Sequence, residues 1–303
     1  MITRGHNFWF LCALILLTVS FVSAQETVKQ GKFAELNATK IHYQDHGKGK
    51  DALVLVHGWG CNLNHWRDQI PELSKRARVL AIDLPGHGLS DKPETKYDMD
   101  LFAAAIEAVM KKAGVERAVL AGHSMGTPVV RQFYRKYPQK TLAIVIVDGG
   151  LRPFGTKEQR EQFMAPLRGA NWKEAIAPMS TFMTATLSEA DKTRVKTSFE
   201  STPQHVLVSA MESMGEDALY ATDKINVPVL AILAKSPFWA PDTEQFLRSL
   251  APDLDYQMWD GVDHFLFMGK PKEFNAAVIA FLDKKNLLKT TQDKKEGETN
   301  GRR

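Results

Sequence analysis

Cysteine is nearly absent from this sequence, which has only Cys12 and Cys61 among its 303 residues. Two cysteines cannot form the network of disulfides that stabilises small secreted scaffolds. Internal repeats are also lacking. With 44% hydrophobic residues, the chain has enough apolar side chains for a sizeable core, as one large α/β domain or two smaller ones. We therefore expect a globular fold stabilised by burial alone.

Most of the chain has no net excess of positive or negative charge. The formal net charge is +4, and residues 284–303 alone hold seven Lys or Arg against three acidic residues. The rest of the chain is close to neutral, so we expect no nucleic-acid partner. The C-terminal segment is polar and rich in Lys, Thr and Gly, which predicts a disordered basic tail over 284–303.

The N-terminus has the pattern of an export signal. Arg4 precedes the apolar run 8–22, and small residues follow at Ser23 and Ala24. This order is typical of a signal peptide, here residues 1–24. The run is shorter than the ~20 residues that a spanning helix needs, so we expect an exported mature protein, periplasmic or secreted, without a stable membrane span. An uncleaved membrane anchor is the alternative.

The chain after residue 25 alternates short apolar runs with helical patterns, which predicts a mainly parallel sheet flanked by helices. Strands are expected at 32–43 (one or two), 51–56, 78–82, 117–121, 142–147, 229–233 and 254–259. Helices are expected at 99–112, 127–136, 242–250 and 272–282. Residues 151–222 have helical patterns and no convincing buried strand, which predicts a helical lid inserted between core segments 25–150 and 223–283.

Residues 122–126 read Gly-His-Ser-Met-Gly between an expected strand and an expected helix. A Gly-x-Ser-x-Gly turn in that position is typical of a nucleophile elbow, because flanking glycines let backbone segments approach without Cβ clashes. We therefore predict that Ser124 is a catalytic nucleophile. A plain strand-to-helix turn is the alternative interpretation.

A second glycine-rich loop, His-Gly-Trp-Gly at 57–60, follows another expected strand. Such a loop can direct a backbone N–H at an oxyanion, together with the N–H of the residue after the nucleophile. The predicted donors are the backbone N–H groups of Trp59 and Met125. Taken alone, the loop would equally fit an ordinary connection from strand to helix.

His264 lies between the last expected strand and the last expected helix. A serine hydroxyl needs a base within hydrogen-bond reach, and imidazole has a suitable pKa. We predict that His264 is this base, the alternative being a surface-loop histidine. His42 and His46 have metal-like spacing but lack a credible third ligand, so we expect no metal and no cofactor.

These motifs, in this order, resemble the α/β-hydrolase superfamily over about residues 32–283. The resemblance includes residues 83–90, which read Asp-Leu-Pro-Gly-His-Gly-Leu-Ser and form a structural turn beside the site in the family. It implies the α/β-hydrolase fold, and it implies that His87 and His123 are packing or supporting residues and not general bases.

The acid that orients the base departs from the family pattern. Relatives commonly place an Asp in the loop after the strand at 229–233, but here residues 234–239 read Ala-Lys-Ser-Pro-Phe-Trp. Asp148, which follows the strand at 142–147, occupies a position that some family members use instead. We predict Asp148 as the acid, with Asp242 as the alternative; Asp148 as a simple turn former also stays open. Asp263 adjoins the base and is not expected to orient it.

Five methionines between Met164 and Met214 suggest an adaptable apolar pocket in the lid, with Trp59, Phe238 and Trp239 near its mouth. We expect a serine hydrolase that cleaves a small or medium, largely apolar carboxylic ester or related acyl compound through an acyl-enzyme. The alternatives are a carbon–carbon bond hydrolase, a haloperoxidase-like perhydrolase, and a weakly catalytic binding protein or sensor. Cys61 is expected to be a small packing residue.

Overall fold

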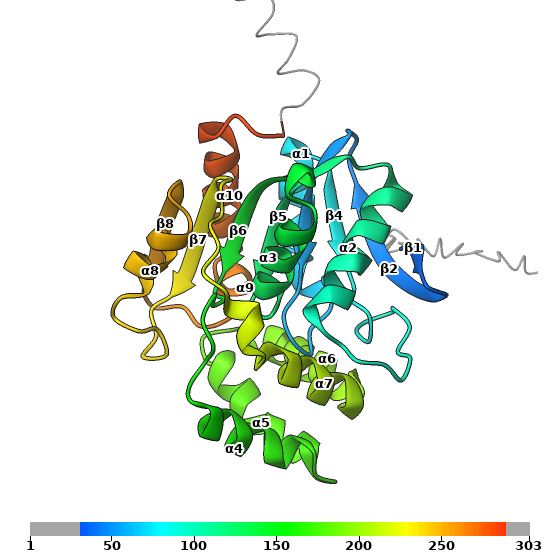
Figure 1. Cartoon of the computed structure of the whole chain (residues 1–303), viewed down its shortest axis with the longest axis vertical. Helices are drawn as coiled ribbons and strands as arrows, with labels where there is room; N and C mark the ends of the chain where they lie inside the picture. Colours follow the sequence, from blue (N-terminus) through cyan, green and yellow to red (C-terminus); the bar gives the residue numbers. More distant parts are fainter. Residues whose placement is uncertain (1–30, 289–303) are drawn as a thin grey trace, which may run out of the picture. The chain divides into compact units, whose positions relative to one another are not determined.

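An eight-stranded sheet forms the centre of the protein in the computed structural model, which describes residues 31–288 (Figure 1). The strand order is β1-β2-β4-β3-β5-β6-β7-β8. The strands are β1 Lys32–Leu36, β2 Thr39–His46, β3 Asp51–Val56, β4 Val79–Ile82, β5 Arg117–His123, β6 Thr141–Val147, β7 Val229–Ala234 and β8 Leu254–Trp259. From β4 to β8 neighbouring strands pair in parallel, whereas β1 and β2 are antiparallel at one edge.

Burial explains why the central strands lie where the apolar runs predict them. All residues of β4 and β7 are buried, and in β3 only the first residue is partly exposed. Strands covered on both faces by helices need apolar residues at successive positions. The segment at 32–43 forms two strands, β1 and the start of β2, because Asn37 and Ala38 adopt left-handed φ values of 48° and 63°, which turn the chain into a hairpin.

Helices cover both faces of the sheet. They are α1 Ile70–Arg76, α2 Met99–Ala113, α3 Gly126–Lys136, α8 Thr243–Leu250, α9 Leu266–Gly269 and α10 Pro271–Lys284. Figure 1 shows α2 and α3 side by side in front of the strands, while α1 packs against α10. The Asp98 carboxylate accepts the Leu101 N–H at the start of α2, and Gly114 ends that helix at φ 67°, as capping preferences require.

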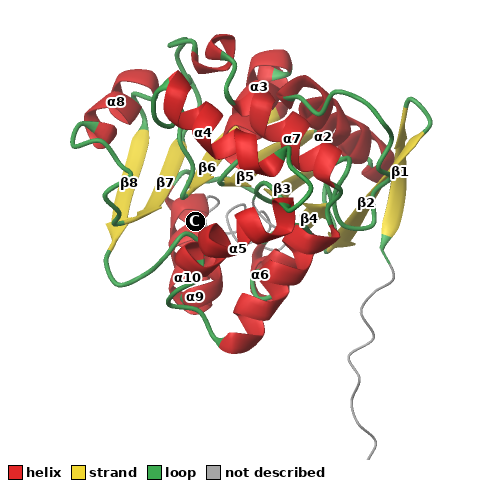
Figure 2. Cartoon of the chain, turned by 90° about the horizontal axis from the view of Figure 1, so that it is seen from below, coloured by secondary structure: helices red, strands yellow, loops and turns green. Residues whose placement is uncertain are grey.

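Four helices connect β6 to β7 and form the lid. They are α4 Lys157–Leu167, α5 Trp172–Met183, α6 Glu189–Ser201 and α7 Gln204–Met214. They gather below the sheet in Figure 1 and lie in front of the strands when seen from below in Figure 2. Phe199 of α6 and Val206 of α7 are buried. The predicted architecture, a mainly parallel sheet with flanking helices and an inserted helical lid, is confirmed.

The two ends of the chain fall largely outside the described residues. The expected signal peptide, 1–24, lies outside them, as do residues 289–303 of the expected tail. Residues 284–288 are described: α10 ends at Lys284, and the Arg76 guanidinium donates to the carbonyl of Leu288 at 2.7 Å. Within residues 31–288, no helix is long and apolar enough to cross a membrane.

Candidate active site

The turn at Ser124 connects β5 directly to α3 and is tightly packed. Ser124 has a left-handed φ of 53°, a conformation that costs energy for a residue with a Cβ. Its N–H donates to the Val147 carbonyl at 3.0 Å. A Cβ at Gly122 would lie 2.2 Å from the Gly126 carbonyl oxygen, and one at Gly126 would lie 2.6 Å from the Val56 carbonyl oxygen. The turn therefore requires both glycines, which is the geometry of an elbow.

His264 and Asp148 meet although they are far apart in the sequence. His264 lies between β8 and α9, and its Nδ1–H donates to Asp148 Oδ2 at 2.7 Å. The other carboxylate oxygen, Oδ1, accepts the Ala234 N–H at 2.7 Å. The Asp148 side chain is 6% exposed and that of His264 is 21% exposed. Because both oxygens are engaged, the carboxylate has one orientation, aimed at the imidazole.

Ala234 stands at the end of β7, next to the loop at 234–239 in which the family resemblance leads us to expect an acid. The backbone N–H of Ala234 instead binds the carboxylate of Asp148, which follows the neighbouring strand β6. Trp239 Nε1–H closes the same loop by donating to the Ala234 carbonyl at 2.9 Å. The main chain of Ala234 thus binds both Asp148 and Trp239.

The alternative acid, Asp242, is engaged elsewhere. Its two oxygens accept hydrogen bonds from the Arg152 guanidinium at 2.8 and 2.9 Å, and that guanidinium lies over the Phe246 ring at 3.7 Å from its centre. The hydrogen bond from Arg152 lowers the pKa of Asp242. Among the described residues, Asp148 and not Asp242 contacts the His264 ring.

The glycine-rich loop at 57–60 touches the elbow, since a Cβ at Gly58 would lie 3.0 Å from Ser124 Cβ. The backbone N–H groups of Trp59 and Met125 have no hydrogen-bond acceptor within residues 31–288. Two N–H groups beside Ser124 that have no protein acceptor are suited to an oxyanion.

The side chain of Trp59 joins the lid to the core. It is 5% exposed, its Nε1–H donates to the Leu207 carbonyl in α7 at 2.8 Å, and its ring packs edge-on against Phe199 at 5.4 Å. That Trp59 lies near the mouth of a pocket stays a prediction. Phe238, in contrast, is 77% exposed.

His123 supports the base through its backbone. A carbonyl oxygen can only accept, so His123 Nε2–H donates to the His264 carbonyl at 2.9 Å, and the two rings are 4.7 Å apart. Burial lowers the pKa of His123 well below its usual value, which keeps the ring neutral. His123, the residue before Ser124, thus holds the main chain of His264.

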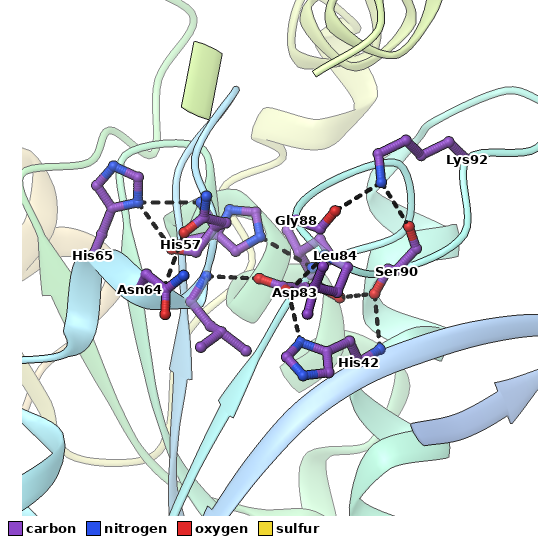
Figure 3. Close-up of polar contacts among 12 residues, drawn as sticks. His42, His57, Asn64, His65, Asp83, Leu84, Gly88, Ser90 and Lys92 are labelled. Atoms are coloured by element: carbon purple, nitrogen blue, oxygen red, sulfur yellow. Dashed lines mark hydrogen bonds and ion pairs between the residues drawn. The ribbon is translucent and has the colours of Figure 1, made fainter. Parts of the chain in front are cut away.

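Two other buried histidines, His42 and His57, lie next to the segment 83–84 (Figure 3). Asp83 accepts hydrogen bonds from His42 Nδ1–H at 2.7 Å and from two backbone N–H groups, those of Leu63 and Leu89. Burial by itself would raise the pKa of Asp83, but these hydrogen bonds outweigh it and lower the pKa. His57 Nε2 accepts the Leu84 N–H at 3.0 Å. This network ties the turn at 83–90 to the loop that starts at residue 57.

These contacts bear on which histidines could be bases or metal ligands. Burial lowers the pKa of His57 to about 3 and that of His87 to about 4. His42 directs Nδ1 at Asp83, and His46 Nε2 lies 3.1 Å from Gln44 Oε1. Within residues 31–288, His, Cys, Asp and Glu side chains form no group of three that could hold a metal ion.

The family is decided by comparison with known proteins. Residues 51–204, half of the chain, match the family model described as alpha/beta hydrolase fold. The chain belongs to the α/β-hydrolase family. This confirms the resemblance seen in the motifs.

This α/β-hydrolase matches parts of longer curated proteins. It is 28% identical over 258 residues to the biotin biosynthesis bifunctional protein BioHC of Cellvibrio japonicus, covering 81% of this chain and 50% of BioHC. It is 39% identical over 101 residues to the dihydrolipoyllysine-residue acetyltransferase component of the acetoin cleaving system of Pseudomonas putida, covering 33% and 27% of the two chains. The chain thus spans about a quarter to a half of the length of these relatives.

Solved structures share the fold of this α/β-hydrolase over most of its length. The bromoperoxidase of Bacillus anthracis matches with a TM-score of 0.76 at 22% identity, covering 84% of this chain and 100% of that one. The enol-lactonase of Burkholderia xenovorans matches with a TM-score of 0.75 at 22% identity, covering 83% and 100%. At this identity the likeness is one of fold, and one fold serves many reactions.

Proposed function

We propose that this protein is a serine hydrolase that cleaves a small or medium, largely apolar carboxylic ester, or a related acyl compound, through an acyl-enzyme. The observation that carries the proposal is the 2.7 Å contact between His264 Nδ1 and Asp148 Oδ2. It brings a buried carboxylate to the imidazole of His264. The backbone carbonyl of His264 accepts a hydrogen bond from His123, the residue next to Ser124. The three proposed residues follow strands of one sheet, Ser124 after β5, Asp148 after β6 and His264 after β8.

The chemistry follows from the tautomer that Asp148 imposes. With Nδ1–H donated to the carboxylate, His264 Nε2 carries the lone pair that accepts the Ser124 hydroxyl proton. Oγ then attacks the ester carbonyl carbon, and the Trp59 and Met125 N–H groups stabilise the oxyanion. His264 gives its proton to the leaving alcohol oxygen. Water, deprotonated by the same nitrogen, hydrolyses the acyl-Ser124 ester.

The test is covalent labelling by a fluorophosphonate combined with hydrolysis of p-nitrophenyl esters of graded chain length. The wild-type protein should be labelled at Ser124, and Ser124→Ala should lose both labelling and at least about 10⁴-fold in turnover, with residual rate from the oxyanion hole. Ser249→Ala, on the exposed face of α8, is the matched control and should keep both. Near-normal turnover by folded Ser124→Ala would contradict a serine mechanism.

A second candidate, perhydrolysis, is favoured by one relative. The chain is 35% identical over 115 residues to a putative non-heme chloroperoxidase of Synechocystis, covering 38% of this chain and 41% of that protein. Hydrogen peroxide in place of water would release a peracid from the same acyl-enzyme. Peroxide- and acetate-dependent bromination of a phenol dye would reveal it, and Ser124→Ala should abolish that activity too.

We also propose that the protein is exported and that residues 1–24 are removed. The support is the order of Arg4, the apolar run and the small residues at 23 and 24. The mature N-terminus, determined by mass spectrometry from cells of the source organism, should lie near Gln25. A full-length N-terminus in the membrane fraction would instead support an anchor.

A further inference from the structure

The carboxylate of Asp263 joins the loop that carries His264 to the lid. Asp263 Oδ2 accepts two hydrogen bonds from Thr186, one from its backbone N–H at 2.9 Å and one from its hydroxyl at 2.8 Å. Asp263 Oδ1 accepts the Phe265 N–H at 3.0 Å. The same side chain therefore binds the residue after His264 and a residue of the lid.

Thr186 lies in the turn between α5 and α6, and this turn has a defined shape. The Leu187 N–H donates to the Thr184 carbonyl at 3.1 Å, and the Thr184 hydroxyl donates to the Ser180 carbonyl at 2.7 Å. Leu187 is buried and lies close to α9, since a Cβ at Gly269 would be 3.4 Å from its Cδ2. The turn thus presents both Thr186 donors to Asp263 from a packed platform.

The loop before His264 is only loosely packed, with Val262 as its contact to the hydrophobic core. A Cβ at Gly261 would have no heavy atom within 4 Å, and Val262 and Asp263 are only partly buried. A local turn at Asp263 needs only the oxygen that accepts the Phe265 N–H. The second oxygen and its two lid donors are additional, and hydrogen bonds to a charged carboxylate are stronger than those between neutral groups.

We propose that Asp263 is a positioning residue that latches the lid to the base loop, so that the position of the His264 imidazole depends on a closed lid. The inference rests on the proposed function, because it assumes that His264 is the base. With Thr186 in place, the loop is held on the lid side by Asp263 and on the sheet side by Asp148 and His123. When the lid turn moves away from Asp263, the loop that carries His264 loses its contact with the lid. The imidazole is then less well placed for proton transfer from Ser124.

Two variants of the full chain weaken the latch with little change in shape. Thr186→Val deletes the hydroxyl donor and keeps the branched side chain, and Asp263→Asn deletes the charge. Thr181→Val is the matched control, because its hydroxyl donates within α5 to the Ala177 carbonyl. Hydrogen exchange of peptides covering 260–266 should become about tenfold faster in both latch variants and stay unchanged in the control. Unchanged exchange in the latch variants would overturn the latch.

Kinetics decide whether the latch acts on the base. In both latch variants, kcat for p-nitrophenyl acetate and the rate of fluorophosphonate labelling should fall about tenfold with KM nearly constant. The double variant should be no slower than the slower single variant, since the two residues act through one contact. A rise in KM with unchanged kcat and labelling would overturn the proposal and assign the lid to substrate access alone.

If wild-type protein neither hydrolyses esters nor is labelled, the proposed function fails, while the exchange comparison still decides whether the latch exists.

Discussion

The loop that carries Ser124 and the loop that carries His264 are built in opposite ways. Around Ser124, added Cβ atoms would lie 2.2 Å from backbone at Gly122 and 2.0 Å from Thr127 Oγ1 at Gly149, whereas Gly261, near His264, faces open space. Ser124 is thus held by close packing of its own turn. His264 is held by hydrogen bonds with residues far away in the chain. Changes near Ser124 should therefore cost stability, and changes around His264 should cost turnover.

Of the changes around His264, Asp148→Asn should reduce turnover the most. The amide can present N–H to Nδ1 and so stabilise the wrong imidazole tautomer, and by analogy with serine proteases the loss in kcat reaches about 10⁴-fold. The unfolding midpoint should change little by comparison. Steady-state kinetics and urea unfolding of the purified variant measure both quantities.

Asp242→Asn is the matched control, since it removes an exposed carboxylate paired with Arg152. It should keep nearly full turnover. A collapse of turnover in Asp242→Asn with normal turnover in Asp148→Asn would exchange the roles of the two acids.

A pair of glycine substitutions tests whether the Ser124 turn depends on close packing more than the His264 loop does. Gly122→Ala should lower the free energy of unfolding by on the order of 4 kcal/mol, because the new Cβ meets backbone that cannot move aside. Gly261→Ala, at φ 67° in open space, should cost only about 1 kcal/mol of backbone strain. Urea unfolding compares them directly. Equal losses would mean that both loops depend on packing to the same extent.

The pH dependence of stability also tests the packing around Ser124. His57 and His87 are buried and neutral, and both contact the loop at 57–60, which touches the Ser124 turn. Burial lowers the pKa of His57 to about 3 and that of His87 to about 4 from an ordinary value of 6.5. Between these values and 6.5, the unfolded chain binds protons that the folded chain does not, so stability falls as the pH falls. Each group should cost at most about 2 kcal/mol by about pH 5, a loss absent above about pH 7. Urea midpoints that stay constant from pH 7 to pH 5 would contradict this.

The smallest effect is expected for Cys61, which follows the loop at 57–60. It is 1% exposed, and burial raises the pKa of its thiol, so the thiolate needed for nucleophilic attack is disfavoured. Cys61→Ser should keep kcat/KM within about twofold and lose about 1 kcal/mol of stability. A folded Cys61→Ser protein as inactive as Ser124→Ala would show that the chemistry has been assigned to the wrong residue.

Local motifs explain what the sequence predicts well, and long-range contacts explain what it misses. The sequence alone singles out the turn at 122–126, because its glycines and serine fall within five residues, and Asp148, because it directly follows an apolar strand. The Asp263–Thr186 contact joins residues 77 positions apart, and both types are common on surfaces, so no pattern marks it. The hydrogen bond from Trp59 to Leu207 likewise depends on where the lid lies, which no local pattern gives. Helix α1, with 7 residues, is too short for a periodic pattern.

The burial of Cys61 makes its thiol a reporter of motion. Among residues 31–288 it is the only free cysteine, and in the closed fold a thiol reagent cannot reach it. Its rate of modification therefore measures how often this part of the molecule opens, as amide exchange does for backbone groups. Comparing that rate with and without a covalent adduct on Ser124 would show whether an occupied site keeps the protein closed.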